Sequence, residues 1–249
     1  MKPILLAGFI LLLYSKEAKA QEIFITRGKI VFEKKTNLSK YAYSIFGENP
    51  GFLDQLIKDL PKYNTAKFEL YFDDSTAWYL NSKPDNLTDK IPDFISTPVT
   101  LKNEYFNLNT SMVVSRKEIY DKKYLIKDHS LKINWHLTNE TRDIIGFKCR
   151  KAFAIIYDSL FLVAFYSEQI VCSSGPESMS GLPGMILGLA IPRFNTTWFA
   201  TSVDPLGFKK NPDSSLQKFL TEQEFETELT SNLSSYQKEK KIIWWQCVL

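Results

Sequence analysis

His129 and His136 are the two side chains in this sequence best suited to acid–base or metal chemistry near neutral pH. They form no His-Glu-x-x-His pattern and no Cys-x-x-Cys pair accompanies them, so a zinc site lacks its usual ligand spacing. The chain also contains no Gly-x-Ser-x-Gly elbow, no P-loop and no Gly-x-Gly-x-x-Gly fingerprint. A Ser–His–Asp triad is compatible with the composition, because its members need not be adjacent in sequence. We therefore expect no metal and no cofactor, and the sequence locates no catalytic group.

Paired carboxylates are a second source of hydrolytic chemistry, and Asp73 and Asp74 are adjacent. On a strand they would face opposite sides of the sheet and could not share a substrate. At a turn, their side chains would accept hydrogen bonds from nearby backbone N–H groups, which is the interpretation we favour. Acid pairs of glycosidases usually come from distant segments, so sequence spacing does not bear on such a pair.

The cysteines are Cys149, Cys172 and Cys247, an odd number that leaves at least one thiol outside any disulfide within the chain. If a hairpin turns at Asp158-Ser159, residue 149 lies opposite residue 168, about four residues short of Cys172. A disulfide between Cys149 and Cys172 would then need a bulge. Buried free thiols are the alternative that we favour.

The first twenty residues have the pattern of an export signal. Lys2 precedes an apolar run from Ile4 to Tyr14, and Ala18-Lys19-Ala20 predicts cleavage between Ala20 and Gln21. An 11-residue helix rises about 16 Å, against roughly 30 Å for a hydrocarbon core, so we expect no transmembrane span in the mature chain. We expect one domain over 21–249, in the periplasm or secreted. Because residues 1–20 carry three lysines and one glutamate, their removal takes the net charge from +3 to +1, which argues against a nucleic-acid partner.

Alternation of apolar and polar residues recurs along the mature chain and predicts half-buried strands. Helical spacing is confined to 52–60 and to a segment after a Thr221–Glu224 capping box, where Phe225 begins an apolar stripe. Such a chain favours an antiparallel sheet. The tail, residues 240–249, is interpreted as a last strand or a segment packed on the sheet, with a partner-docking patch as the alternative. The expected strands cover 23–32, 67–72, 76–80, 112–115, 123–126, 131–137, 147–157, 160–166, 185–191 and 196–203.

Residues 170–191 hold two backbone breaks before a buried strand. Leu182-Pro183-Gly184-Met185 predicts a type II turn, with proline and glycine at its central positions. Gly175-Pro176 is the other break, and Gly181 allows a close backbone approach. Glycine-rich backbone also forms anion-binding nests, but Pro183 lacks the N–H that a nest needs, so a structural turn is favoured.

The run Gly181-Leu182-Pro183-Gly184-Met185-Ile186 resembles the signature of the GLPGLI family, exported proteins of Bacteroidetes-type bacteria, with Met185 in place of the usual leucine. The resemblance extends to Gly175-Pro176, whereas 164–166 and 170–172 depart from the family's usual residues. The family has no established activity. The resemblance implies an exported, β-rich domain with a curved antiparallel sheet, bowl-like or half-barrel. The helical patterns at 52–60 and after Thr221 add one short helix and a C-terminal helix. The domain is similar to the module that precedes the catalytic domain in some bacterial peptide N-glycosidases. Upstream motifs that match are Gly28 to Glu33, Trp135, Glu140-Thr141 and 144–152.

Three functions follow as hypotheses. The leading one is a non-enzymatic binding or accessory protein that holds an apolar or peptide-like ligand, or an envelope protein, on one face of its curved sheet. A concave face filled by the protein's own side chains would count against it. The second is a hydrolase of envelope or host polymers, which predicts convergent carboxylates or a cluster around His129 or His136 in a pocket. The third is a structural module that docks through residues 242–249.

Overall fold

The computed structural model describes residues 24–47, 50–81, 99–120, 122–207, 218–233 and 240–249. The predicted cleavage site between Ala20 and Gln21 lies outside these residues. The helices are α1 (Leu38–Phe46), α2 (Pro50–Ile57), α3 (Glu222–Asn232) and α4 (Lys240–Val248), with short 3-10 turns η2 (Pro176–Ser178) and η3 (Pro192–Phe194). The strands are β1 (Gly28–Asn37), β2 (Tyr63–Phe72), β3 (Thr76–Asn81), β4 (Val99–Asn107), β5 (Met112–Ile119), β6 (Lys122–His129), β7 (His136–Ile144), β8 (Phe147–Ile156), β9 (Leu160–Ser167), β10 (Met185–Ile191) and β11 (Thr196–Asp204).

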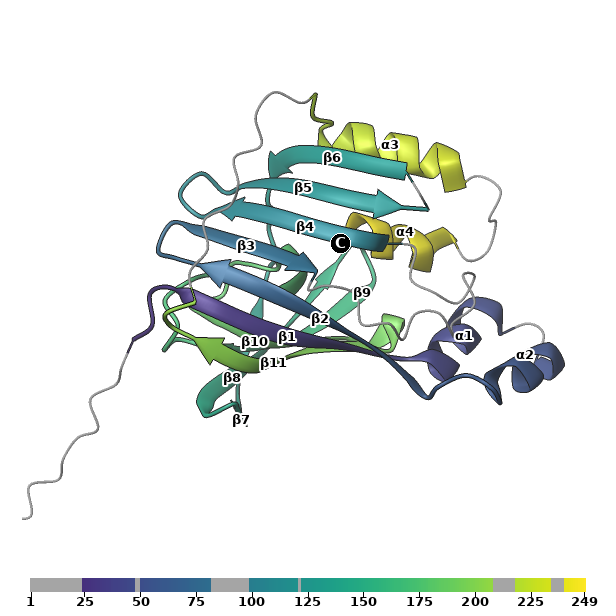
Figure 1. The fold of residues 1–249 in the computed structure, drawn as a ribbon, viewed down its shortest axis with the longest axis horizontal. Helices are drawn as coiled ribbons and strands as arrows, with labels where there is room; N and C mark the ends of the chain where they lie inside the picture. The colour runs from purple at the N-terminus through teal and green to yellow at the C-terminus, as the bar shows by residue number, and fades with distance from the viewer. Residues whose placement is uncertain (1–23, 48–49, 82–98, 121, 208–217, 234–239) are drawn as a thin grey trace, which may run out of the picture.

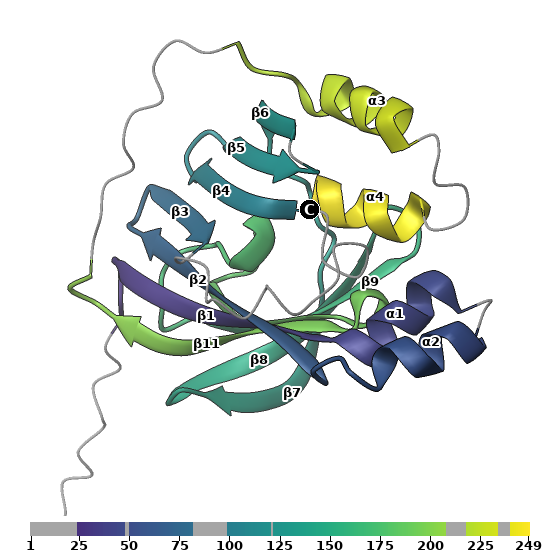
Figure 2. The same ribbon diagram turned by 45° about the vertical axis from the view of Figure 1, so that its right-hand side comes forward.

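These eleven strands form one antiparallel sheet in the order β6-β5-β4-β3-β2-β1-β11-β10-β9-β8-β7 (Figure 1). The sheet is open, because its end strands β6 and β7 each pair with one neighbour. It is strongly curved, and α4 and the segment that carries η2 lie within the curve (Figure 2). The prediction of a mainly β, antiparallel fold with a C-terminal helix is confirmed.

Period-2 alternation is the physical basis of this agreement. In β2, Phe68, Leu70 and Phe72 are buried on one face while the residues between them are partly exposed. The predicted hairpin is also present, with Ile156 opposite Leu160 in the β8–β9 pair. At the β2–β3 turn, Asp73 accepts hydrogen bonds from the backbone N–H groups of Ser75 and Thr76, as predicted for a turn carboxylate.

Two helices differ from the expectation. The chain's last residues form the helix α4 rather than a strand, and both of its sides are covered, since Ile242, Ile243, Trp245 and Cys247 are buried. Surrounding apolar side chains therefore override the β preference of isoleucine and tryptophan. Helix α1 had no place in the prediction, although Asn37 caps it by accepting a hydrogen bond from Lys40 N at 3.0 Å.

Three further predicted elements can be compared with the structure. The strand expected at 131–137 begins only at His136, while the helix expected at 52–60 is present as α2. The capping box at Thr221 and Glu224 starts α3 as predicted. None of the helices in the described residues is long and apolar enough to cross a membrane.

The signature segment, residues 170–191, does not contain the type II turn that was predicted at Leu182–Met185. Gly184 N donates to Leu182 O at 2.8 Å, and Met185 N donates to Ile170 O, so a three-residue turn centred on Pro183 replaces the type II turn. Gly184 keeps the positive φ that was expected, 144°, and a Cβ there would overlap the carbonyl oxygen of Ser167. The backbone N–H groups of Gly184 and Met185 therefore donate to carbonyl oxygens of the protein itself, as in a structural turn.

Candidate functional site

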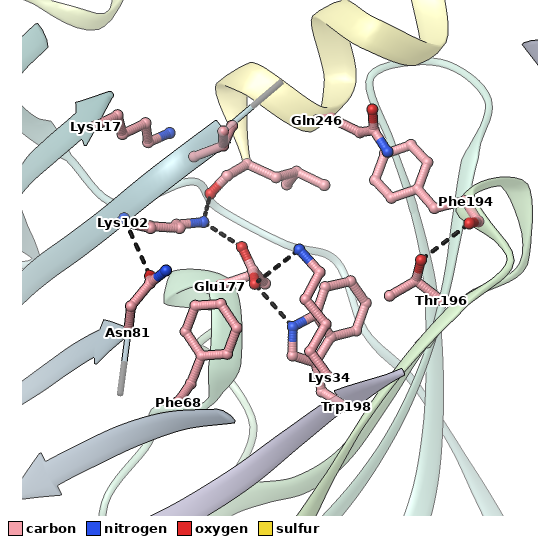
Figure 3. A pocket seen from close by; sticks show the side chains of 12 residues that line it. Lys34, Phe68, Asn81, Lys102, Lys117, Glu177, Phe194, Thr196, Trp198 and Gln246 are labelled. Atoms are coloured by element: carbon pink, nitrogen blue, oxygen red, sulfur yellow. Dashed lines mark hydrogen bonds and ion pairs between the residues drawn. The ribbon is translucent and has the colours of Figure 1, made fainter. Parts of the chain in front are cut away.

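Glu177 is the centre of a buried polar network inside the curved sheet (Figure 3). It lies in η2, directly after Pro176, with a left-handed φ of 57° that turns its side chain inward. Its Oε1 accepts hydrogen bonds from Trp198 Nε1 at 2.8 Å and from the Tyr79 hydroxyl at 3.2 Å. Its Oε2 accepts from Lys102 Nζ, and Lys34 Nζ lies 4.0 Å from Oε1. One carboxylate thus joins β1, β3, β4 and β11 to the signature segment.

The electrostatics of Glu177 are those of a structural anion. Burial alone would raise the pKa of its carboxyl, but the charges of Lys102 and Lys34 lower this pKa to about 2. Burial also lowers the pKa of the Lys34 ammonium, against the attraction of Glu177. Glu177 is ionised at neutral pH and has both oxygens engaged, so it is unsuited to proton transfer.

Glu104 and Lys117 extend this network toward α4. Glu104 Oε1 accepts a hydrogen bond from Ser115 at 3.0 Å, and its Oε2 accepts from the hydroxyl of Ser178. Lys117 Nζ donates to the carbonyl oxygens of Cys247 at 3.1 Å and Val248 at 2.8 Å. These carbonyls end α4 without helical partners, and an ammonium there also complements the negative end of the helix dipole.

The space directly beside Glu177 is small. Its volume is about 30 Å³, room for little more than ordered water. The residues around it are those drawn in Figure 3, among them Lys34, Phe68, Trp198 and Gln246. This space offers no room for an organic ligand.

A larger cavity, of about 160 Å³, lies between the β5–β6 sheet, the signature segment and α3, and we call it the α3 cavity. The carboxyl groups of Glu222 and Glu226 on α3 line it and have no side-chain hydrogen bond in the described part of the chain. Burial raises the pKa of both, and for Glu222 the attraction of Lys117 opposes burial while other acids reinforce it. The remaining lining residues are Glu104, Val113, Ser115, Lys117, Ile126, Asp128, His129, Ser130, Leu131, Ile133, Tyr157, Glu177, Ser178, Met179, Val248 and Leu249.

Asp128 differs from Glu222 and Glu226 in the direction of its pKa shift. Its carboxylate accepts hydrogen bonds from the backbone N–H groups of Glu222 at 3.0 Å and His129 at 2.6 Å. These bonds lower its pKa. The cavity therefore holds two carboxyl groups with a lowered pKa, Asp128 and Glu177, and two with a raised pKa, Glu222 and Glu226.

The structure separates the two histidines. His129 is exposed at the edge of the α3 cavity, whereas His136 is exposed and stacks on Phe153, with ring centroids 5.1 Å apart. Among the described residues, no three His, Cys, Asp or Glu side chains are placed to hold a metal ion together.

Cys149, Cys172 and Cys247 are all buried free thiols, so no disulfide joins Cys149 to Cys172. The β8–β9 register places Arg150 opposite Tyr166, which leaves Cys172 beyond the end of the pairing as expected.

The residues that resemble the GLPGLI signature lie on the same segment as Glu177. A Cβ on Gly175 would come within 2.6 Å of the Ile186 Cβ, so glycine is needed for close packing there. Gly181 has a φ of 92°, and Trp135 donates its indole N–H to the neighbouring Ser180 carbonyl at 2.8 Å. Sequence reasoning missed Glu177, although its charge is isolated among small and apolar residues between Gly175 and Gly184. Of the other signature residues, Pro176, Leu182, Met185 and Ile186 are buried, whereas Pro183 is exposed.

The comparisons with known proteins show a similarity of fold and nothing further. No family model matches the chain, and no curated protein sequence matches it. Two solved structures are similar, of PNGF-II in space groups P21 and C2, each 15% identical, with TM-scores of 0.51 and 0.50. Each match covers 79% of this chain and 31% of the other, so the chain spans about a third of the solved proteins it resembles.

Proposed function

We propose that this protein is an exported, non-enzymatic binding or accessory protein of the GLPGLI type, acting in the periplasm or after secretion. Its ligand places one end in the α3 cavity. The observation that carries this proposal is a cavity of about 160 Å³ whose wall is partly apolar and includes two carboxyl groups, Glu222 and Glu226, that lack side-chain hydrogen bonds in the described chain.

The concave face of the sheet is unsuited to a ligand spread across it. The signature segment and α4 occupy that space, with Met179, Leu182, Trp245 and Val248 all buried. The proposed site is therefore the α3 cavity at its margin.

The walls of the cavity suggest the chemistry of the ligand. Ile126, Met179 and Val248 present apolar surface, while the free carboxyl groups accept hydrogen bonds. A peptide-like ligand with an apolar side chain and an N–H donor at its end matches both. The cavity volume fits such an end group rather than a whole ligand.

A thermal-shift and native mass screen with short peptides, fatty amides and glycans tests this proposal. Ligands with an N–H end group should stabilise the protein, and Glu226→Gln should weaken their binding. Glu140→Gln, an exposed acid on β7, is the matched control and should leave binding unchanged. Equal binding to the wild type and to Glu226→Gln would contradict the assigned site.

A hydrolase is the second candidate, favoured by the contrast between Asp128 and Glu222 in one cavity. A carboxylate held ionised beside a carboxyl group with a raised pKa is the arrangement that hydrolases use for base and acid. Release of reducing ends or of amines from envelope and host polymers should then depend on Asp128, and Asp128→Asn should abolish it. Absence of any product with the wild type would remove this candidate.

Docking through the tail receives no support. Ile242, Ile243, Trp245, Cys247 and Val248 are core residues, so deletion of 242–249 should unfold the domain rather than merely release a partner.

A further inference from the structure

A second cavity shares part of its wall with the α3 cavity. Its volume is about 300 Å³, and we call it the serine cavity. Ser130, Leu131 and Ile133 line both cavities, and both cavities touch the signature segment. The wall of the serine cavity also includes Phe106, Leu108, Ser111, Ser173 and Ser180.

Residues 130–135 connect the two ends of the open sheet. β6 and β7 are its end strands, far apart in the strand order, yet they follow one another in the chain (Figure 1). The residues between them contain no helix, no turn and no positive φ. At one end Ser130 N donates to Ser111 O at 2.7 Å, and at the other Trp135 donates its indole N–H to Ser180 O at 2.8 Å. The segment is therefore anchored at both ends and forms part of both cavity walls.

The backbone of residues 131–134 is available to a ligand. None of these four residues has a backbone hydrogen bond to another described residue. Leu131, Lys132 and Asn134 are exposed, so water satisfies their N–H and C=O groups in the free protein. A run of exposed, unpaired backbone groups is what an extended peptide recognises when it adds a strand.

The protein itself already pairs an extended segment with the preceding part of β6. Leu220 N donates to Leu125 O, and Lys127 N donates to Leu220 O, both at 2.9 Å. This pairing ends where α3 begins at Glu222. Among the described residues no segment continues it along 131–134, so a ligand is needed to do so.

The acids of the α3 cavity indicate which end of a peptide binds there. Glu222 and Glu226 have no side-chain hydrogen bond to a described residue, and their charges complement an N-terminal ammonium group. Lys117 also lines this cavity, but its Nζ donates to the carbonyl oxygens of Cys247 and Val248. A C-terminal carboxylate would instead face charges of its own sign.

The serine cavity can accept a side chain from further along such a peptide. The hydroxyls of Ser111, Ser130 and Ser180 have no hydrogen bond in the described part of the chain. Phe106 and Leu108 add apolar surface to the same wall. A side chain with both a methyl and a hydroxyl group, such as threonine, matches this lining.

We propose that residues 131–134 bind an extended peptide by backbone pairing, with the free amino terminus of the peptide in the α3 cavity and a later side chain in the serine cavity. This assignment rests on the proposed function, because it takes the α3 cavity as a ligand site. Four extended residues span about 13 Å, so a peptide of four or five residues pairs along the whole segment. A glycan has no alternating N–H and C=O groups and an acyl chain has neither, so both leave this backbone unpaired.

Titration of the full chain with three ligands tests the proposal. They are Leu-Thr-Val-Thr amide, the same tetrapeptide N-methylated at its second and third residues, and leucinamide, which carries the amino end alone. N-methylation of two successive residues removes a donor from each edge of an extended peptide. The unmodified tetrapeptide should bind at least about tenfold more tightly than the other two, the effect of one or two hydrogen bonds.

The outcomes separate this proposal from the function on which it rests. Equal affinity of the tetrapeptide and leucinamide, or of the methylated and unmethylated peptides, would overturn backbone pairing and leave the amino-end site intact. Binding by none of the three would overturn both. Glu226→Gln should weaken all three ligands alike, and a length effect without that weakening would overturn the placement of the amino end.

Hydrogen exchange followed by NMR locates the pairing. The amides of residues 131–134 should exchange rapidly in the free protein, since they have no partner among the described residues. Saturating tetrapeptide should slow exchange at alternate residues of this segment at least about tenfold, and leucinamide should not. Unchanged exchange with the tetrapeptide bound would refute the assigned segment.

A matched pair of variants tests the same groups from the side of the protein. Leu131→Pro combined with Lys132→Pro removes two N–H groups that pair with no described residue, and Leu131→Ala combined with Lys132→Ala keeps them. The proline variant should bind the tetrapeptide at least about tenfold more weakly than the alanine variant, and both should bind leucinamide equally. Equal tetrapeptide affinity would contradict the pairing. If the proline variant fails to fold, exchange in the wild type decides: absence of protection overturns the proposal.

Discussion

The carboxylate of Glu177 lies 2.8 Å from the indole nitrogen of Trp198, which connects the signature segment to β11 near the middle of the sheet. Lys102 and Lys34 complete the surroundings of the same carboxylate from β4 and β1. Elements from both halves of the curved sheet therefore meet at one buried charge. This arrangement makes Glu177 the residue on which the packing of the interior depends most directly.

Removal of the charge of Glu177 should destabilise the protein strongly. Glu177→Gln removes the counter-charge of Lys34 and leaves the buried Lys102 with only Glu104, whose Oε1 lies 3.5 Å from its Nζ. Breaking a buried ion pair such as Lys102–Glu177 costs about 3–5 kcal/mol. Urea unfolding followed by tryptophan fluorescence measures the loss. Glu140→Gln, whose acid is 66% exposed, should change stability by less than about 1 kcal/mol. A Glu177→Gln loss no larger than that of this control would show that the network is not needed for stability.

The contribution of Glu177 should disappear in acid. Its pKa is about 2 in the folded protein against an ordinary 4.5, so its stabilisation is complete above about pH 4.5 and is lost as the pH falls toward 2. The unfolding free energies of the wild type and Glu177→Gln should therefore converge between these pH values. Denaturant titrations from pH 7 to pH 2 check this, and a difference that stays constant across the range would contradict the assigned charge state.

The effect of Glu226 on stability should depend on pH in the opposite direction to that of Glu177. Burial raises the pKa of its carboxyl in the folded protein, so ionised Glu226 opposes folding once the pH exceeds that raised pKa. Glu226→Gln should be more stable than the wild type at pH 7, and its advantage should shrink as the pH falls to 4. Thermal unfolding at several pH values measures the difference. A variant less stable than the wild type at pH 7 would indicate a hydrogen-bonding role for this carboxylate.

Gly184 should tolerate no side chain. A Cβ at this position would overlap Ser167 O, and the φ of 144° is unfavourable for other residues, so Gly184→Ala should cost at least about 2 kcal/mol. Gly51→Ala in α2 is the matched control, because its Cβ would contact nothing within 4 Å and alanine favours a helix. Comparable unfolding midpoints for the two variants would contradict the close approach of Gly184 to β9.

The three thiols should be free and slow to react. Burial raises the pKa of Cys149, Cys172 and Cys247 to about 12, so little thiolate forms near neutral pH. Labelling of the native protein with a thiol reagent should be slow, and the unfolded protein should take up three labels with or without reductant. Fewer labels in the absence of reductant would reveal a disulfide.

Local chemistry along the chain was enough to predict the β-rich character, the β8–β9 hairpin and the start of α3. In each case the signal lies within a few neighbouring residues: alternation in 67–72, a turn at Asp158-Ser159, a hydroxyl and carboxylate at Thr221 and Glu224. Helix α1 had a similar local signal in its Asn37 cap, but one cap before a short apolar stripe was too weak to identify it.

Contacts between residues far apart in the sequence decided the position of the Glu177 network and the helical form of the tail. The chain between Lys34 and Trp198 contains nearly every strand of the sheet, so no pattern of neighbours could reveal that both meet at Glu177. The tail has the composition of a strand but forms α4, because Lys117 caps its carbonyl end and apolar side chains enclose it on both sides. Secondary structure in this protein follows largely from nearest-neighbour preferences. The sites follow from which distant segments the curvature of the sheet brings together, since burial and charge compensation exist only once that curvature forms.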